Sequence, residues 1–225
     1  MRALIAGGGI GGLAAAVALR RAGIDVLVLE RAGRIEEVGA GLSLWANAML
    51  ALRCLGVEER VAEAGSILTR LTTVSWSGTT IQNLDLGAIN KRAGADSVCA
   101  HRADLQRALA DALPSIAIRT GAPCMSFTEE SGGISLHLEN GETERGDLLI
   151  GADGIRSVIR RQLLGDAAPR YAGYIALRGI AHDSGSLPPG EQLFVQGRGV
   201  QVGVLPCGSD RTYWFATRNA KAGTR

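Results

Sequence analysis

A cluster of five glycines within residues 7–12 constrains the fold of this chain more than any other feature. It follows a short apolar run at residues 2–6 and precedes the segment LAAAVALRRAG, which predicts a helix that ends at Gly23. A second apolar run at residues 24–30 predicts a buried strand. A strand, a glycine-rich turn, a helix and another strand in this order predict the opening of a parallel α/β sheet.

The spacing Gly7-x-Gly9-x-x-Gly12 is typical of a turn that binds a dinucleotide. Gly7 permits the tight turn, Gly9 lets the backbone approach a pyrophosphate, and Gly12 lets the helix pack closely on the strand. We expect the amides of Ile10 and Gly11 to face the phosphates, because they lie at a helix N-terminus.

An acidic residue, Glu30, closes the second strand 18 residues after Gly12, where the dinucleotide pattern requires a partner for a ribose diol. An acid there argues against a 2′-phosphate. The adjacent Arg31 either flanks the adenosine or is a solvated arginine. The motif does not distinguish FAD from NAD, and a glycine-rich turn beside a surface glutamate is the purely structural alternative.

Composition and charge narrow the class of function. The net charge is +2, which is too small to indicate a nucleic acid or an anionic membrane as partner. Four cysteines without CxxC spacing predict reduced, buried thiols in a cytosolic protein, and three scattered histidines predict no metal site.

Residues 3–19 are uncharged, as in the apolar core of a signal peptide. Their glycines are costly in a helix, however, and favour a folded βα unit.

The rest of the chain predicts both helices and antiparallel strands. Residues 45–64 and 101–113 have helical patterns, whereas residues 69–86 predict a hairpin. Residues 117–150 predict a β-meander with a turn at Asn140-Gly141, followed by the run DLLIGADG and a short helix. After Gly165 the pattern changes to strand-like segments separated by turns.

Four segments carry a resemblance to a known family: GGGIGG…LERA, VGAGLSLWANA (38–48), HRADLQRAL (101–109) and LLIGADGIRSVIR (148–160). They resemble the FAD-dependent single-component flavoprotein monooxygenases, the aromatic hydroxylases of the para-hydroxybenzoate hydroxylase type. The resemblance covers residues 1–217. The last segment, with Asp153-Gly154, matches the family's DG motif, which is more specific than the glycine motif.

The resemblance implies roles for residues near the cofactor. Gly7, Gly9 and Gly12 would bind the FAD pyrophosphate, and Glu30 the adenosine ribose. A backbone group at Cys124 would contact the adenine.

Two further segments resemble parts of the family that contact the flavin. Gly39-Ala40-Gly41 matches a loop near the flavin ring or the ribityl chain, and Arg102 matches an arginine that reaches the FAD phosphates or the ribityl hydroxyls.

The DG motif resembles one that the family uses for both FAD and the transient NAD(P)H, which would involve Asp153 and Arg160. The residues themselves leave a structural alternative open. Asp153 could cap a helix, and Arg156, Arg160 and Arg161 could form a solvated helix face.

The resemblance implies an α/β (α+β) fold: a Rossmann-like FAD-binding domain with a β-meander, and a partial β-rich substrate domain. We assign residues 1–65 and 100–165 to the first domain and residues 66–99 and 166–225 to the second. The family's later GDAAH…P…GqG segment is absent, and the chain resembles the N-terminal part of a longer enzyme. We therefore expect an unpaired sheet edge around residues 191–218 and a tendency to form homo-oligomers.

The implied function is an FAD- and NAD(P)H-dependent monooxygenase in the cytoplasm. It would hydroxylate an aromatic or polycyclic small molecule with O₂, through a flavin hydroperoxide. The pattern assigns no catalytic residue and does not identify the substrate. The alternatives are a truncated FAD-binding fragment without turnover, a halogenase or an isoprenoid reductase; the Trp-x-Trp-x-Ile-Pro segment of a halogenase is absent.

Overall fold

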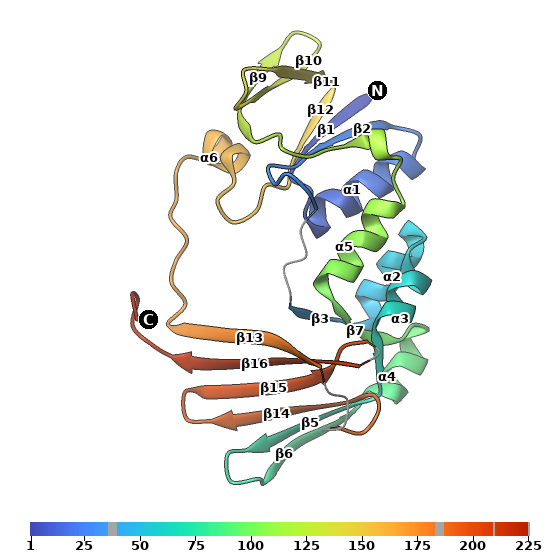
Figure 1. The fold of residues 1–225 in the computed structure, drawn as a ribbon, viewed down its shortest axis with the longest axis vertical. Coiled ribbons are helices and arrows are strands. Elements are labelled where there is room, and N and C mark those ends of the chain that lie inside the picture. Colours follow the sequence, from blue (N-terminus) through green and yellow to red (C-terminus); the bar gives the residue numbers. More distant parts are fainter. Residues whose placement is uncertain (36–39, 183–186, 209, 225) are drawn as a thin grey trace. The chain divides into compact units, whose positions relative to one another are not determined.

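The computed structural model describes residues 1–35, 40–182, 187–208 and 210–224. The chain divides into two compact units (Figure 1). The first comprises Met1–Glu37 and Gln106–Pro169, and the second comprises Val38–Leu105 and Arg170–Arg225.

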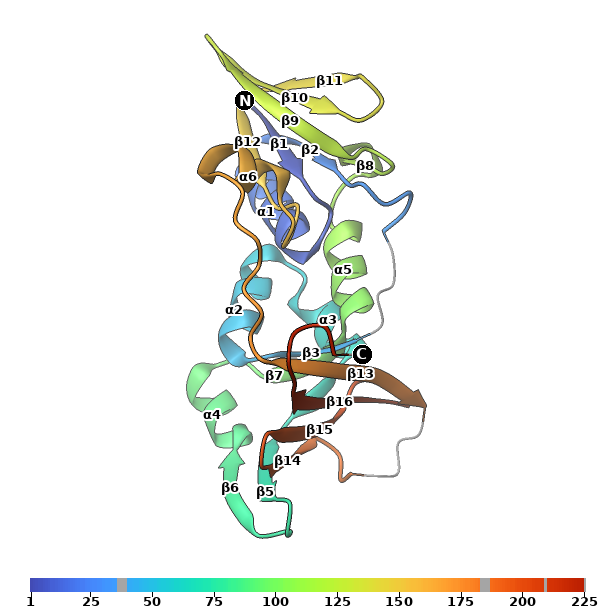
Figure 2. The same ribbon diagram turned by 90° about the vertical axis from the view of Figure 1, so that its left-hand side faces the viewer.

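The first unit is built on a parallel four-stranded sheet in the order β12-β1-β2-β8. Strand β1 (Arg2–Ala6) lies between β2 (Asp25–Leu29) and β12 (Leu148–Gly151), and β8 (Ile118–Arg119) is next to β2. Helix α1 (Ile10–Arg21) packs on β1 and β2 (Figure 1, Figure 2). The strand, turn, helix and strand predicted for residues 2–30 are confirmed.

A three-stranded antiparallel sheet completes the first unit and confirms the predicted meander. It consists of β9 (Cys124–Glu130), β10 (Gly133–Leu138) and β11 (Thr143–Gly146), with Gly141 in the turn at a φ of +86°. Helix α6 (Val158–Leu164) packs against β9. Side chains from both sheets and from α6 form one core: Leu4, Leu27, Leu29, Phe127, Leu136, Leu138 and Ile159.

Helix α5 (Arg102–Asp111) crosses the division between the units, and a short 3₁₀ turn, Ser115–Ala117, follows it. The predicted helix at residues 101–113 therefore exists, and it ends before Pro114 as expected.

The second unit contains a six-stranded sheet in the order β13-β16-β15-β14-β5-β6. The predicted hairpin is β5 and β6, and it joins this sheet by parallel pairing of β5 with β14. The bounds are β5 (Arg70–Ser75), β6 (Thr80–Asp85), β13 (Tyr174–His182), β14 (Glu191–Gly197), β15 (Val200–Pro206) and β16 (Arg211–Asn219).

The expected unpaired edge around residues 191–218 is wrong. Strands β14, β15 and β16 lie inside the sheet, because β13 pairs with β16 along its whole length and β5 pairs with β14. Within the described residues, β13 and β6 are the edge strands.

A smaller antiparallel sheet, β3-β7-β4, also belongs to the second unit. The predicted helix at residues 45–64 is two helices, because Gly56 adopts a left-handed φ of +76° that ends the first one. The bounds are β3 (Gly41–Leu44), α2 (Ala46–Leu55), α3 (Glu58–Ala64), β4 (Ser66–Leu68), α4 (Leu86–Ala93) and β7 (Ser97–His101). A second core joins this sheet to the larger one through Leu68, Leu71, Leu86, Cys99, Leu205, Cys207 and Tyr213.

The two compact units differ in extent from the two predicted domains. Residues 38–65 and 100–105, which we assigned to the FAD-binding domain, belong to the second unit. A domain defined by the cofactor it binds need not coincide with a unit defined by packing, so the domain assignment stays a prediction.

The cysteines are free thiols, but they are not all buried as predicted. Cys99 and Cys207 are buried and Cys124 is partly buried, whereas Cys54 is exposed. Cys54 is exposed because the buried side of α2 consists of Ala46, Met49 and Leu52. No helix in the described part of the chain is long and apolar enough to cross a membrane.

Candidate dinucleotide site

Two positions admit only glycine: Gly7 in the turn between β1 and α1, and Gly12 in the first turn of α1. Gly7 has a φ of +106°, and a Cβ on it would lie 2.4 Å from the carbonyl oxygen of Ala152. A Cβ on Gly12 would lie 1.9 Å from the carbonyl oxygen of Gly7. The first and third glycines of the motif therefore allow the close packing of the turn, of α1 and of the segment after β12, as the spacing predicts.

The middle of the turn is open. A Cβ on Gly9 or Gly11 would meet no heavy atom within 4 Å. The first hydrogen bond of α1 runs from the Leu13 amide to the Gly9 carbonyl at 2.9 Å, so the amides of Ile10 and Gly11 precede the bonded part of the helix. Among the described residues, no side chain caps this end of α1, and its first turn contains no acid. Within the part of the chain that the structure describes, these two amides have no hydrogen-bond partner and can donate to an anion.

Glu30 fixes the turn to the end of β2. Its Oε2 accepts the amide of Gly8 at 2.6 Å, and its Oε1 accepts the amide of Ala32 at 2.9 Å. The carboxylate therefore lies beside the glycine turn, where the sequence predicted a ribose-binding acid.

Gln106 also holds this turn, and the sequence pattern did not identify it. Its Nε2 donates to the carbonyl oxygen of Gly8 at 2.8 Å. The only sequence feature that could have indicated Gln106 is its position within the segment HRADLQRAL. No sequence pattern around a helical glutamine predicts a contact with a residue 98 positions away.

Cys124, at the start of β9, lies near two other predicted residues. Burial raises the pKa of its thiol to about 11, and the carboxylates of Asp153 and Glu30 contribute to the increase. The structure therefore brings together three predicted site residues that come from β2, from β9 and from the DG motif.

The side chains of the DG motif hold the start of α6. Asp153 accepts the Ser157 hydroxyl at 2.5 Å and the Val158 amide at 2.6 Å. Ser157 in turn accepts the amide of Arg160 at 2.9 Å, and the Arg160 guanidinium donates to the Ile155 carbonyl at 2.5 Å. The helix-capping role that the sequence left open for Asp153 is present in this structure.

The DG motif is also next to the glycine turn, because Gly7 packs against Ala152 and the Cα of Asp153. Asp153 and Arg160 shape this part of the site through the backbone that they hold. The arrangement of free helix amides, a fixed glutamate and a tightly packed turn can bind a dinucleotide through its pyrophosphate and a ribose.

Comparison with known proteins agrees with this geometry. A family model described as "FAD binding domain" matches residues 1–221. The chain belongs to the FAD binding domain family.

Two proteins with named activities are similar to the chain over nearly its whole length. It is 41% identical over 220 residues to the aurachin C monooxygenase/isomerase of Stigmatella aurantiaca, a match that covers 98% of this chain and 57% of the relative. It is 37% identical over 223 residues to the 3-amino-4-hydroxybenzoate 2-monooxygenase of Streptomyces cremeus, covering 96% and 56%. The chain therefore spans a little over half the length of these relatives.

A solved structure has the same fold as the chain. The crystal structure of Klebsiella pneumoniae HpxO complexed with FAD and uric acid matches with a TM-score of 0.92 and 32% sequence identity. The match covers 100% of this chain and 58% of that one. The predicted α/β (α+β) fold, with a parallel sheet and further β-rich sheets, is confirmed.

The other predicted site residues are not all in the same compact unit. Gly41 begins β3 in the second unit, and a Cβ on it would lie 2.3 Å from Cγ of Tyr213. Arg102 is the exposed first residue of α5, also in the second unit, and its amide donates to the Ala40 carbonyl at 2.9 Å. Arg31 is exposed in the first unit. Gly39 lies outside the described residues.

Proposed function

We propose that the protein binds FAD at the glycine turn and is part of an FAD- and NAD(P)H-dependent monooxygenase that hydroxylates an aromatic small molecule. The observation that carries the proposal is the open N-terminus of α1, with free amides at Ile10 and Gly11 beside the fixed carboxylate of Glu30. Membership in the FAD binding domain family supports flavin over a nicotinamide nucleotide as the resident cofactor.

The residues fit the adenosine diphosphate half of FAD. The open space above Gly9 and Gly11 admits a pyrophosphate, and the dipole of α1 favours its negative charge. Gly7 and Gly12 keep the turn close to the sheet. The Glu30 carboxylate retains lone pairs for the ribose hydroxyls after accepting the two amides.

The remaining predicted residues have supporting roles in this proposal. The backbone of Cys124 contacts the adenine, and Asp153 and Arg160 hold the DG turn against Gly7. Gly41 and Arg102 contribute to binding the flavin half of the cofactor. Arg31 is a solvent-exposed residue beside the adenosine.

Bound FAD, once reduced by NAD(P)H, would supply the electron transfer and the activation of O₂. The protein has to bind the cofactor, orient the substrate and exclude water. We assign no catalytic side chain. The relatives are named as monooxygenases, two of them for the aromatic compounds 3-amino-4-hydroxybenzoate and 6-hydroxynicotinate, which favours this reaction over the halogenase and isoprenoid reductase alternatives. We place the activity in the cytoplasm, where NAD(P)H is available.

The test compares this chain with a version that has the full length of its relatives. Each protein is given FAD, NAD(P)H and ¹⁸O₂ with a panel of aromatic compounds that includes hydroxybenzoates, 6-hydroxynicotinate and urate. We expect the longer protein to add one ¹⁸O atom to at least one substrate. NAD(P)H oxidation that is independent of O₂, or no labelled product from any aromatic compound, would contradict the proposal. Flavin binding without turnover by both proteins would support the alternative of a binding module.

A further inference from the structure

The six-stranded sheet of the second unit has an apolar side opposite to the side that packs on the core. One row of Cα partners crosses five strands on this side: Val74, Val195, Val202, Ala216 and Leu177. The next row on the same side contains Leu193, Val204 and Trp214. We call these two rows the outer face. Leu205 and Tyr213, which follow Val204 and precede Trp214 in the sequence, point to the other side and belong to the core.

The outer face is exposed although it is apolar. Leu177 is 66% exposed and Trp214 is 37% exposed, and the other members of both rows are partly exposed. An antiparallel sheet with a core on one side normally carries polar residues on its solvated side. An exposed apolar patch in place of those polar residues indicates an interaction surface.

Two tryptophan rings lie close against this side of the sheet. A Cβ on Gly179, the Cα partner of Trp214, would lie 3.0 Å from the Trp214 ring. A Cβ on Gly197, two residues after Val195 and therefore on the same side, would lie 3.5 Å from the ring of Trp76. Trp76 is 69% exposed. Because glycine lies beneath each ring, the outer face offers broad aromatic surfaces that are close to the plane of the sheet.

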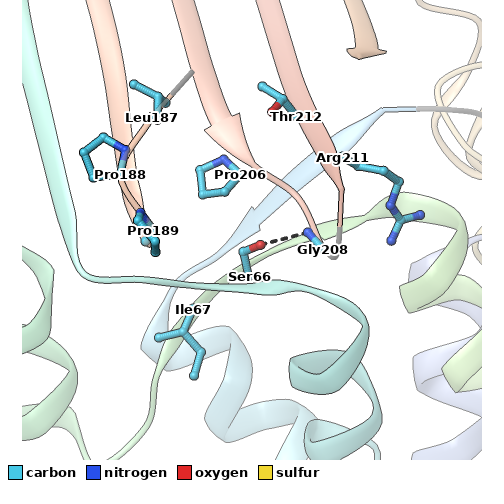
Figure 3. Close-up of a pocket in the computed structure, with 10 residues that line it drawn as sticks. Ser66, Ile67, Leu187, Pro188, Pro189, Pro206, Gly208, Arg211 and Thr212 are labelled. Carbon is cyan, nitrogen blue, oxygen red and sulfur yellow. Dashed lines mark hydrogen bonds between the residues drawn. The ribbon is translucent and has the colours of Figure 1, made fainter. Parts of the chain in front are cut away.

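One end of the outer face opens into a cavity of about 340 Å³ (Figure 3). Pro206 and Thr212 line the cavity and are Cα partners; Thr212 is two residues before Trp214 and so lies on the same side of the sheet. Figure 3 shows Pro206 between Pro188 and Thr212. A cavity beside an apolar face can take a side chain of a partner, as at the anchor residues of interfaces.

The two rows of the outer face contain no charged side chain, and charges lie only at their ends. At one end Arg70 pairs with Glu191 at 3.3 Å, and at the other end Arg218 is two residues after Ala216. An apolar centre with a polar rim is typical of a protein–protein interface. The uncharged centre gives no attraction for a nucleic acid or an anionic membrane.

We propose that two copies of this chain associate through their outer faces as a symmetric dimer. A second copy presents the same flat, uncharged surface, so no charge is buried against another charge. Two sheets can pack face to face at about 10 Å with their side chains interdigitated. The outer face contains no residue to which we assign FAD binding, so the dimer is independent of the proposed function.

The size of the outer face sets the strength of the dimer. Five strands about 4.8 Å apart, with alternate residues about 6.8 Å apart, give a face of roughly 20 by 20 Å. Two such faces bury on the order of 1,000 Å² of accessible surface, which is at the lower end for specific complexes. We therefore expect a reversible dimer with a Kd in the micromolar range.

Sedimentation velocity of the chain without cofactor, at concentrations above and below this Kd, measures the dimer. Leu177→Lys and Trp76→Lys each bury an unpaired ammonium group in the interface, and each should raise the Kd more than about tenfold. Both residues are largely exposed in the single chain, so both variants should fold. Ile116→Lys is the control, because Ile116 is 87% exposed but belongs to the first unit. It should leave the Kd unchanged.

A chain that stays monomeric at every concentration would overturn the proposal. So would an equal rise in Kd for Ile116→Lys, or a dimer that persists when Leu177→Lys and Trp76→Lys are combined. A monomeric chain that cosediments with phosphatidylcholine vesicles would assign the outer face to a membrane instead. Urea unfolding checks each variant. Should Leu177→Lys fail to fold, Trp76→Lys decides the result, because Trp76 lies in a turn outside the strands.

Discussion

The Oε2 atom of Glu30 accepts the backbone amide of Gly8 at 2.6 Å. This hydrogen bond joins the end of β2 to the glycine turn, so the two parts of the dinucleotide motif hold each other in place before any ligand binds. Folding therefore orders the site before the ligand arrives. Less conformational entropy is then lost on binding, and the affinity for the ligand is higher.

Replacing Glu30 with alanine should weaken FAD binding by about 1.5–3 kcal/mol, the range for hydrogen bonds to a charged group. This corresponds to a roughly 10- to 150-fold higher Kd, and a flavin fluorescence titration measures it. Asp25→Ala is the matched control, because Asp25 is an exposed acid at the other end of β2. Equal affinities for the two variants would mean that Glu30 acts only within the fold.

The third glycine of the motif should be essential for stability, whereas its neighbour should not. Gly12→Ala places a Cβ against the Gly7 carbonyl oxygen, 1.9 Å away before relaxation, and should cost about 2–3 kcal/mol of unfolding free energy. Gly11→Ala meets no atom and should change stability by less than about 1 kcal/mol. Urea unfolding without ligand compares the two. A similar loss for both would show that α1 does not pack on the turn as described.

The sequence predicted the first unit well because its signals are local. The glycine spacing and the apolar runs define β1, α1 and β2, and Asn140-Gly141 marks the turn between β10 and β11. In the second unit, the short elements β3, β4, β7 and α4 were not predicted. The strands among them, β3, β4 and β7, are three to five residues long and depend on long-range pairing, such as Gly41 with His101. Local periodicity contains no information on such pairing.

The predicted site residues show the same limit. Glu30 was identifiable because its motif has a fixed spacing, whereas Gln106 contacts Gly8 only through the tertiary fold. For Asp153 the sequence could not decide between a cofactor contact and a helix cap. The geometry shows a cap that also shapes the turn beside Gly7.

If Asp153 caps α6, its replacement should destabilise the protein even without ligand, which the loss of a purely ligand-binding residue would not do. Asp153→Ala and Ser157→Ala should each lower stability by about 1–2 kcal/mol without ligand. The double variant should lose less than the sum, by about 1 kcal/mol, because the two side chains are hydrogen-bonded to each other. Asp166→Ala, an exposed acid beyond α6, is the control for charge. Full additivity in urea unfolding would contradict the shared cap.

Cys124 should react with alkylating reagents only at high pH. Its pKa is raised to about 11 by burial and by Asp153 and Glu30, from an ordinary value of 9.0. The neutral thiol therefore stabilises the fold fully below pH 9, and this contribution is lost as the pH rises toward 11. The alkylation rate at Cys124, followed by peptide mapping, should keep rising between pH 9 and 11. A plateau near pH 9 would contradict the rise in the pKa of Cys124 that burial and the two carboxylates cause.

The binding of FAD at the glycine turn can be measured directly. The purified chain is incubated with equal concentrations of FAD and NAD, freed of unbound nucleotide and denatured, and the released nucleotide is identified by chromatography. We expect that FAD is released by the chain and that much less is released by the Glu30→Ala variant. Release of NAD without flavin, or equal FAD from both proteins, would contradict it.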